Sequence, residues 1–204
     1  ENMSQAPHIL PASRSGIRLG HGKIIDTMIN DGLWDAYGDK HMGSCAETCA
    51  TEYKFSRKDQ DEFAISSYKK SQKAQEDGLF DTEITPVSIK DRKGNEIIVN
   101  KDEEPNNVNF EKILKLRPVF QKDGTITAGN ASTINDGAAA TLVTTESYAK
   151  DHNLPIQAHI LAQASVAQEP EWFTTAPVKA MNKVLAKAGL TIDDIDLFEI
   201  NEAF

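Results

Sequence analysis

The sequence lacks the features that mark secreted and membrane proteins. It contains two cysteines in 204 residues, too few for a disulfide framework. No stretch approaches the ~18 consecutive apolar residues of a membrane-spanning helix, and residues 1–20 lack the apolar core of a secretory signal. We therefore expect a cytoplasmic protein that does not act at a membrane.

Positive charge and aromatic side chains are also scarce. Lys and Arg number 22 against 31 Asp and Glu, which gives a net charge of −9, and aromatic residues make up 7% of the chain. Phosphate backbones bind to concentrated positive charge, so a nucleic-acid partner is not expected. The remaining composition, with 39% hydrophobic and 26% charged residues, is typical of one or two globular domains.

Several common catalytic motifs are absent. Ser132 lies in no Gly-x-Ser-x-Gly elbow, so a hydrolase triad is not indicated. There is no Walker loop, and the glycines from Gly16 to Gly22 follow no predicted strand, which excludes a dinucleotide fingerprint.

Three side chains that can bind metal share one helical face. His41, Cys45 and Cys49 are spaced i, i+4 and i+8, which spreads them over about 12 Å of helix, too far for one zinc ion. We expect no zinc and interpret the cysteines as buried thiols in a reducing compartment. A metal-binding module centred on Cys45 and Cys49 is a distant alternative.

Hydrophobic periodicity and capping residues predict helices over 41–53, 56–76 and 175–188, and a hairpin over 84–99. The first residues of the 56–76 helix resemble a capping box, and Gly78 stands where a left-handed C-cap glycine is expected. Thr175 is the expected N-cap of the last helix. Apolar runs at 160–166 and 196–200 predict buried strands on either side of that helix, which implies a parallel sheet covered by helices.

Two other regions are less regular. Residues 1–40 are rich in glycine and indicate a long excursion loop with a short helix within 24–33. Small residues between Thr125 and Val143 allow close backbone approach to a neighbour, and composition alone favours a core strand there. The chain does not begin with Met and closes just after an apolar run, so we expect an internal segment of a longer polypeptide.

Several motifs follow one another along the chain: residues 1–8, 31–33, 41–43, 56–61, 127–132, 135–140 and 201–204. In this order they resemble the thiolase family, and within it the acetyl-CoA acetyltransferases. The resemblance implies the α/β thiolase fold, in which two similar halves pack as α-β-α-β-α layers with a loop domain inserted in the first half. Residues 1–133 would form this CoA-binding loop domain, 134–154 the end of the N-terminal half and 155–204 the start of the C-terminal half.

The resemblance also implies a set of residues that bind acyl-CoA. Near pantetheine these would be Leu33, His41, Met42, Ala128 and Ser132. Near the nucleotide end they would be Val108, Lys112 and Phe120. Tyr68 and Phe204 would complete the set. Many relatives carry an Arg near the adenine that is missing between Pro105 and Asn109. Local cations such as Lys112 must then attract an anionic cofactor to an acidic protein.

A potassium ion is implied by a sub-branch of the family that Tyr68 and Phe173 resemble. Its oxygen ligands would come from Tyr68, Ala128, Gly129 and Ala131, mostly as backbone carbonyls.

The implied reaction joins two acetyl-CoA into acetoacetyl-CoA and CoA, or runs in reverse as thiolysis, through an acyl-enzyme on cysteine. Asn201 would hold the water of an oxyanion hole. The nucleophilic Cys, the catalytic His and the basic Cys of the family match no position in these residues, so the segment alone is expected to be inactive. The alternative is a non-catalytic thiolase-like module that binds acyl-CoA or lipid.

The resemblance further implies fatty-acid or ketone metabolism and a homo-oligomer, a dimer or a tetramer. Family tetramers make contacts through the excursion at residues 8–30.

Overall fold

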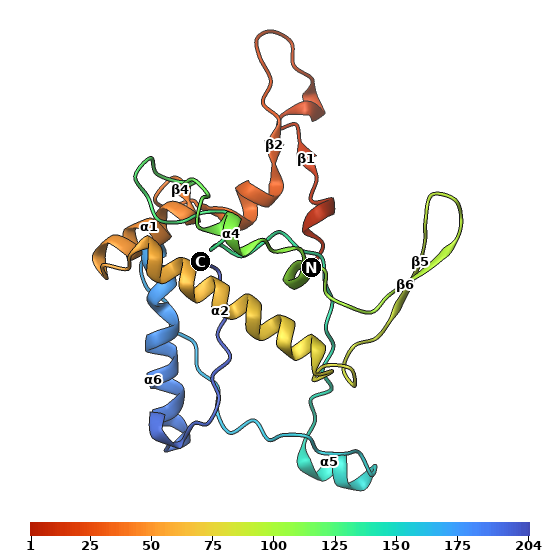
Figure 1. The fold of residues 1–204 in the computed structure, drawn as a ribbon. Coiled ribbons are helices and arrows are strands. Elements are labelled where there is room, and N and C mark those ends of the chain that lie inside the picture. The colour runs from red at the N-terminus through yellow and green to blue at the C-terminus, as the bar shows by residue number, and fades with distance from the viewer. The chain divides into compact units, whose positions relative to one another are not determined.

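The computed structural model describes all 204 residues, and the chain divides into two compact units. The first unit comprises Glu1–Cys49 and Ile134–Asn201, and the second comprises Ala50–Thr133 and Glu202–Phe204. Helix α1 (Met42–Glu52) runs from the first unit into the second (Figure 1).

Short antiparallel ribbons and helices make up the first unit. Its strands and 3-10 or π-helices are η1 (Met3–Gln5), β1 (His8–Ile9), η2 (Ser13–Ser15), β2 (Ile25–Asp26), η3 (Met28–Leu33), β3 (Trp34–Asp35), β4 (Lys40–His41), η4 (Pro170–Thr175) and η5 (Ile192–Asp194). Its α-helices are α5 (Glu146–Asp151) and α6 (Ala176–Ala188). Strand β1 pairs with β2, and β3 pairs with β4.

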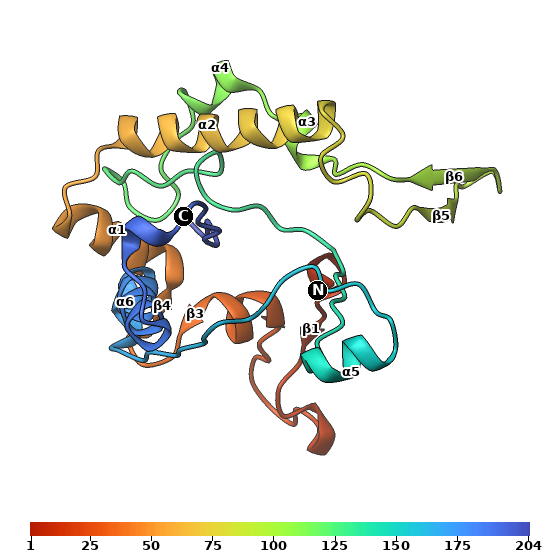
Figure 2. The same ribbon diagram turned by 90° about the horizontal axis from the view of Figure 1, so that it is seen from below.

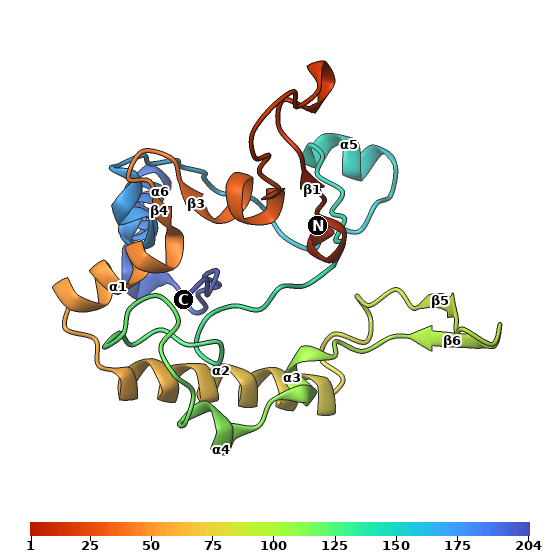
Figure 3. The same ribbon diagram turned by 90° about the horizontal axis from the view of Figure 1, so that it is seen from above.

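One long helix organises the second unit. Helix α2 (Arg57–Glu76) is followed by the hairpin of β5 (Val87–Lys90) and β6 (Glu96–Val99) and by the short helices α3 (Glu104–Asn107) and α4 (Phe110–Ile113). Figures 2 and 3 show α3 and α4 running alongside α2, with the hairpin projecting beyond the C-terminal end of α2. This brings the residues after the hairpin back along the helix.

The ends of α2 confirm the sequence prediction. The Ser56 hydroxyl accepts the N–H of Asp59 at 3.1 Å, and the Asp59 carboxylate accepts the N–H of Ser56 at 3.0 Å, which together form a capping box. After the helix, Gly78 has φ +66°, the left-handed conformation that glycine adopts without strain. The predicted hairpin and the predicted helices α1 and α6 are also present.

The two strands predicted beside α6 are not formed. Residues 155–169 and 195–204 are extended but pair with no strand, and Leu161 is 74% exposed. A strand needs a neighbour for its backbone hydrogen bonds. Here the carbonyls of Gln163 and Ser165 instead accept the ammonium groups of Lys187 and Lys183 from α6, at 3.2 and 3.0 Å. No parallel sheet is therefore present in the chain.

Two further local expectations are wrong. The region Thr125–Val143 is a series of turns and extended backbone, not a core strand: beyond a single bridge between Asp136 and Asn2 it pairs with no strand, and residues 136–143 are exposed. Thr175 stands at the N-cap position of α6 as expected, but its hydroxyl does not cap the helix: it donates to the carbonyl of Trp172 at 3.0 Å and accepts from Gln168 at 2.7 Å.

Replacing Ser56 with Ala should lower the free energy of unfolding by about 1 kcal/mol, because α2 loses its N-cap. Hydrogen bonds from Ser56 hold the pKa of Asp59 below its usual value. The cap therefore adds to the free energy of unfolding at pH values above the ordinary pKa of a carboxyl. This contribution is lost as the pH falls through the lowered pKa of Asp59. In urea unfolding, the wild type should have a higher free energy of unfolding than Ser56→Ala at pH 7, and the difference should decrease at acidic pH. Ser71→Ala, at an exposed position of the same helix, is the matched control, and an equal loss in it would contradict the capping role.

Candidate functional site

A buried polar network holds the loop at Thr125–Ser132 in the second unit. The side-chain oxygen of Asn130 accepts the N–H of Thr127 at 2.8 Å. Its amide nitrogen donates to the carbonyl of Thr125 at 3.0 Å and to the carboxylate of Asp61 at 2.9 Å. Asn130 and Thr127 are both buried, so these bonds replace contacts with water that the loop has lost.

Asp61 joins this loop to α2 and to the end of α4. It is 3% exposed, and its second oxygen accepts Nε of Arg57 at 2.8 Å. The other two nitrogens of Arg57 donate to the carbonyls of Leu116 and Ile113, each at 3.0 Å. A buried carboxylate is tolerated when it is paired and hydrogen-bonded, as it is here. Asp61 and Arg57 therefore position the loop.

Gly129 allows the same loop to lie against apolar side chains. A Cβ at this position would stand 2.9 Å from Cδ1 of Leu116 and 3.0 Å from Cγ1 of Ile113. These distances are shorter than normal carbon contacts, so a larger residue would displace the loop or its neighbours. The small residue is required for close approach, as the composition of the region suggested.

The C-terminal motif meets this loop within the second unit. The N–H of Ser132 donates to the carbonyl of Ala203 at 3.1 Å. The rings of Phe120 and Phe204 lie edge to face with centroids 6.2 Å apart. The structure thus brings together three residues expected at the acyl-CoA site, Ser132, Phe120 and Phe204. Asn201 is exposed and belongs to the first unit.

The face of α2 toward α3 carries Tyr68. Its hydroxyl donates to the carboxylate of Glu104 at 3.2 Å, and burial together with this carboxylate raises the pKa of Tyr68. Gln72 donates to the carbonyl of Pro105 at 2.6 Å, which fixes α3 against α2. Of the residues expected near the nucleotide, Val108 is half-buried between α3 and α4, and Lys112 is exposed on α4.

The backbone carbonyls of the Thr125–Ser132 loop are the type of ligand that a hard cation such as potassium prefers. The carbonyls of Ala128, Gly129 and Ala131 accept no hydrogen bond in the structure, which leaves their lone pairs available. Tyr68 also retains an oxygen lone pair while it donates to Glu104. These atoms are of the donor type that the ion takes, and the potassium site remains a prediction.

A second group of expected residues lies in the first unit. The pairing of Trp34 with His41 brings Leu33 and Met42 to the same end of the β3–β4 ribbon. Nδ1 of His41 accepts the N–H of Gly43 at 3.0 Å, and burial lowers the pKa of His41 below its usual value. The imidazole is therefore largely neutral at pH 7.

The cysteines of α1 have the surroundings of structural thiols. Cys45 is fully buried, its sulfur lies 4.0 Å from a carboxylate oxygen of Asp35, and burial raises its pKa. Since the thiolate is the nucleophile, a raised pKa disfavours catalysis by Cys45. Cys49 is half-buried and free. No cluster of three or more His, Cys, Asp or Glu side chains has a geometry that could hold a metal ion.

Arg57, Asp61 and Asn130 lie within the motifs at 56–61 and 127–132, but the sequence alone assigns them no role. Their pairing depends on a contact across 69 positions of the chain. The one feature of the sequence that could have indicated a role for these residues is their position inside two motifs.

No helix of the structure has the length and apolar character needed to cross a membrane.

Family comparisons cover nearly the whole chain. The family model "Thiolase, N-terminal domain" matches residues 1–147, and "Thiolase, C-terminal domain" matches residues 154–204. The chain is 46% identical over 205 aligned positions to "Acetyl-CoA acetyltransferase" of Pseudomonas aeruginosa, and 48% identical over 205 to "Probable acetyl-CoA acyltransferase" of Staphylococcus aureus. Each alignment covers 100% of this chain and 52% of the relative, so the chain spans about half the length of these curated relatives.

Solved structures agree with this result. The acetyl-CoA acetyltransferase of Bacillus anthracis superposes with a TM-score of 0.93 at 40% identity, over 99% of this chain and 51% of that one. The enzyme of the same name from Syntrophomonas wolfei superposes with a TM-score of 0.91 at 36% identity, over 100% of this chain and 51% of that one.

Replacing Gly129 with Ala should destabilise the protein by roughly 1–3 kcal/mol, because the new Cβ would overlap side chains of Ile113 and Leu116. Thermal or urea unfolding measures the effect. Gly137→Ala is the matched control, since a Cβ at Gly137 meets nothing within 4 Å and its φ is not in the left-handed region. Equal stability of the two variants would contradict the close contact of Gly129 with Ile113 and Leu116.

Replacing Asp61 with Asn should cost about 3 kcal/mol of folding free energy, because Arg57 would lose its buried counter-charge. Glu76→Gln, at an exposed position of the same helix, makes the same chemical change without a buried partner. Denaturant unfolding of both variants compares them directly. If Asp61→Asn unfolds at the same denaturant concentration as Glu76→Gln, the network does not hold the loop.

Proposed function

Because the chain belongs to the thiolase family and has the α/β thiolase fold, we propose that its whole protein joins two acetyl-CoA molecules into acetoacetyl-CoA and CoA, or catalyses the reverse thiolysis. One observation carries the proposal. The N–H of Ser132 donates to the carbonyl of Ala203, and this bond joins the motif at 127–132 to the motif at 201–204. The first lies in the region matched by the N-terminal family model and the second in the region matched by the C-terminal one.

The proposed binding residues suit a long, thin thioester. Ala128 and Ser132 are small and exposed, so backbone can approach pantetheine closely along this loop. The Asp61 and Asn130 network supports this role because it holds the loop in one conformation before a ligand binds. Leu33, His41 and Met42 are proposed to contact the same part of the ligand, His41 as a neutral imidazole.

Nearer the nucleotide end, the proposed contacts are Val108, Lys112 and Phe120, with Phe204 beside Phe120. Lys112 is exposed and can place its ammonium group on a phosphate.

The proposed division of the chain follows from the same fold. Residues 1–133 would form the inserted loop domain, 134–154 the end of the N-terminal half and 155–204 the start of the C-terminal half. The main segment of the second unit ends at Thr133, which agrees with the boundary at 133, whereas Glu1–Cys49 group with Ile134–Asn201 in the first unit.

The chemistry requires an acyl-thioester on a nucleophile, a base that removes an α-proton, and donors for the oxyanion. Asn201 is the proposed residue for the last role, through a water that its side-chain amide orients. Cys45 cannot serve as the nucleophile, because it is fully buried and its pKa is raised. We therefore place the nucleophilic Cys, the catalytic His and the basic Cys outside these residues and expect no turnover by the 204 residues alone.

Potassium is a proposed accessory ion. Tyr68 and the carbonyls of Ala128, Gly129 and Ala131 would hold it, and its positive charge would stabilise the orientation of these carbonyls in the acyl-CoA loop.

A homo-oligomer, a dimer or a tetramer, is also part of the proposal. The excursion at residues 8–30 exposes several large apolar side chains, among them Leu19 at 96% and Ile24 at 75%. Exposed apolar groups on a projecting ribbon are typical of a surface that contacts a partner.

Replacing Asn201 with Ala in the whole protein should lower kcat roughly 10²–10³-fold, because the oxyanion would lose an oriented donor. Thiolysis of acetoacetyl-CoA, followed by loss of its absorbance, measures the rate. Asn182→Ala, at an exposed position of α6, is the control and should turn over at the wild-type rate. An unchanged kcat in Asn201→Ala would remove the assigned role, while a wild-type protein that binds CoA without thiolysis would favour the non-catalytic binding module.

A further inference from the structure

One ion pair of the first unit joins two distant stretches of the chain. Lys40 on β4 is paired with Glu171 on η4, 131 positions later in the sequence, and both side chains are half-buried. The other lysine ion pairs link residues four positions apart on one helix: Lys58–Glu62, Lys73–Asp77 and Lys150–Glu146. Pairs with this spacing support a helix, whereas the pair of Lys40 with Glu171 fixes one element against another.

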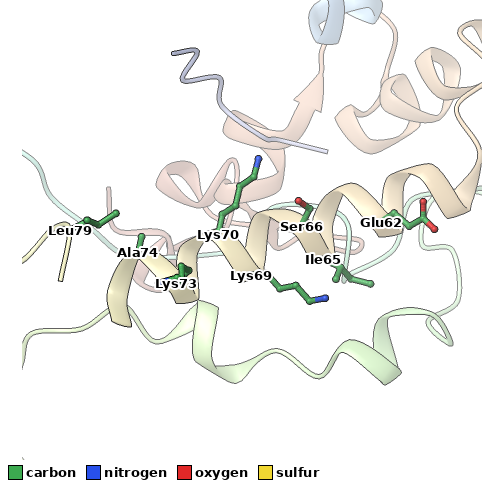
Figure 4. A pocket seen from close by; sticks show the side chains of 8 residues that line it. All are labelled: Glu62, Ile65, Ser66, Lys69, Lys70, Lys73, Ala74 and Leu79. Atoms are coloured by element: carbon green, nitrogen blue, oxygen red, sulfur yellow. The ribbon is translucent and has the colours of Figure 1, made fainter. Parts of the chain in front are cut away.

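The lysines of α2 illustrate the difference. Lys69, Lys70 and Lys73 line an open hollow on one face of this helix, together with Glu62 (Figure 4). None of these three lysines forms an ion pair with a residue of another element. Lys40 is therefore the lysine whose ion pair ties two elements together.

The turn between β3 and β4 makes room for the side chain of Lys40. A Cβ at Gly38 in this turn would overlap a carboxylate oxygen of Asp35 and stand 3.1 Å from Cε of Lys40. Asp35 is buried and accepts the N–H of Tyr37 at 3.0 Å, which holds the turn in this shape. The stem of Lys40 therefore packs against a fixed turn, while its ammonium group meets Glu171.

Glu171 contacts the chain on both sides of His41. Lys40 directly precedes His41 in β4, and Thr48, on α1 after it, places its hydroxyl 3.5 Å from the same carboxylate oxygen, a weaker contact. Successive side chains of a strand point to opposite faces, so Lys40 can face η4 while His41 faces away from it. One carboxylate thus fixes the junction of β4 and α1, where His41 accepts the N–H of Gly43.

We propose that Lys40 and Glu171 are positioning residues, which fix the β4–α1 junction against η4 and so hold the imidazole of His41 where it contacts acyl-CoA. The ligand in this inference rests on the proposed function. The N-terminal family model matches the region of β4 and the C-terminal one the region of η4, so the pair also ties together the two parts of the family sequence. Without the pair the junction could shift, and a contact residue displaced by about 1 Å binds and orients its ligand less well.

The test combines thiolysis kinetics of the whole protein with a direct probe of His41. Lys40→Met keeps the apolar stem of the lysine and Glu171→Gln keeps the size of the glutamate, so each variant removes one charge with little change in volume. In each, KM for acetoacetyl-CoA should rise roughly threefold to tenfold while kcat stays within about twofold, because a binding contact is weakened and the reacting groups are not. The double variant should be no worse than either single one, since both remove the same interaction. In two-dimensional NMR spectra the imidazole signals of His41 should shift in all three variants.

The matched control is Lys150→Met/Glu146→Gln, which removes a Lys–Glu pair of α5 in the same unit and should leave KM, kcat and the His41 signals at their wild-type values. Unchanged His41 signals in the Lys40 and Glu171 variants, an unchanged KM in these variants of an active protein, or an equal rise of KM in the control overturns the inference. If the His41 signals shift as expected but the wild-type protein neither binds CoA nor catalyses thiolysis, the positioning of His41 by this pair stands and the proposed acyl-CoA function fails.

Discussion

The carboxylate of Asp61 lies buried between the guanidinium of Arg57 and the side-chain amide of Asn130, and the second unit is built around this contact. A buried charge is costly unless each of its oxygens has a partner, and here each oxygen has one. Through Arg57 the contact reaches the carbonyls of Ile113 and Leu116, and through Asn130 it reaches the backbone of the Thr125–Ser132 loop. Loss of any member would leave a buried polar group without a partner.

Polar pairing is decisive here because few apolar side chains are buried. The buried hydrophobic residues are Cys45, Ala46, Ala50, Ile113, Ile126 and Ala149, most of them small. Burial of such side chains contributes little free energy compared with a core of leucine and phenylalanine. The loop that carries Ala128 and Ser132 is therefore held by hydrogen bonds and by the close contact at Gly129. The same features leave Ala128 and Ser132 exposed, as the proposed binding of a thin ligand requires.

Local features were predicted well and long-range ones were not. The capping box at Ser56, the helix end at Gly78 and the hairpin after residue 84 each depend on residues within a few positions of one another. The strands expected at 160–166 and 196–200 depend on a neighbouring strand, and none pairs with them in the chain. Their apolar pattern remains visible in the alternating exposure of residues 161–169. Pattern alone thus indicates which residues suit a sheet but not whether the sheet forms.

By itself the sequence determined the family, the approximate bounds of the helices α1, α2 and α6, and the residue types available to a ligand. Motif order and capping residues depend only on short stretches of chain. Only the tertiary structure decided that Asp61 supports Asn130, that Ser132 bonds to Ala203, and that Lys69 and Lys70 line an open hollow. The two hydrogen bonds join residues that lie far apart in the sequence. The hollow depends on which side of α2 no other element covers. Both follow from how the segments pack, and packing is settled by the free energy of the whole unit and not by any one segment.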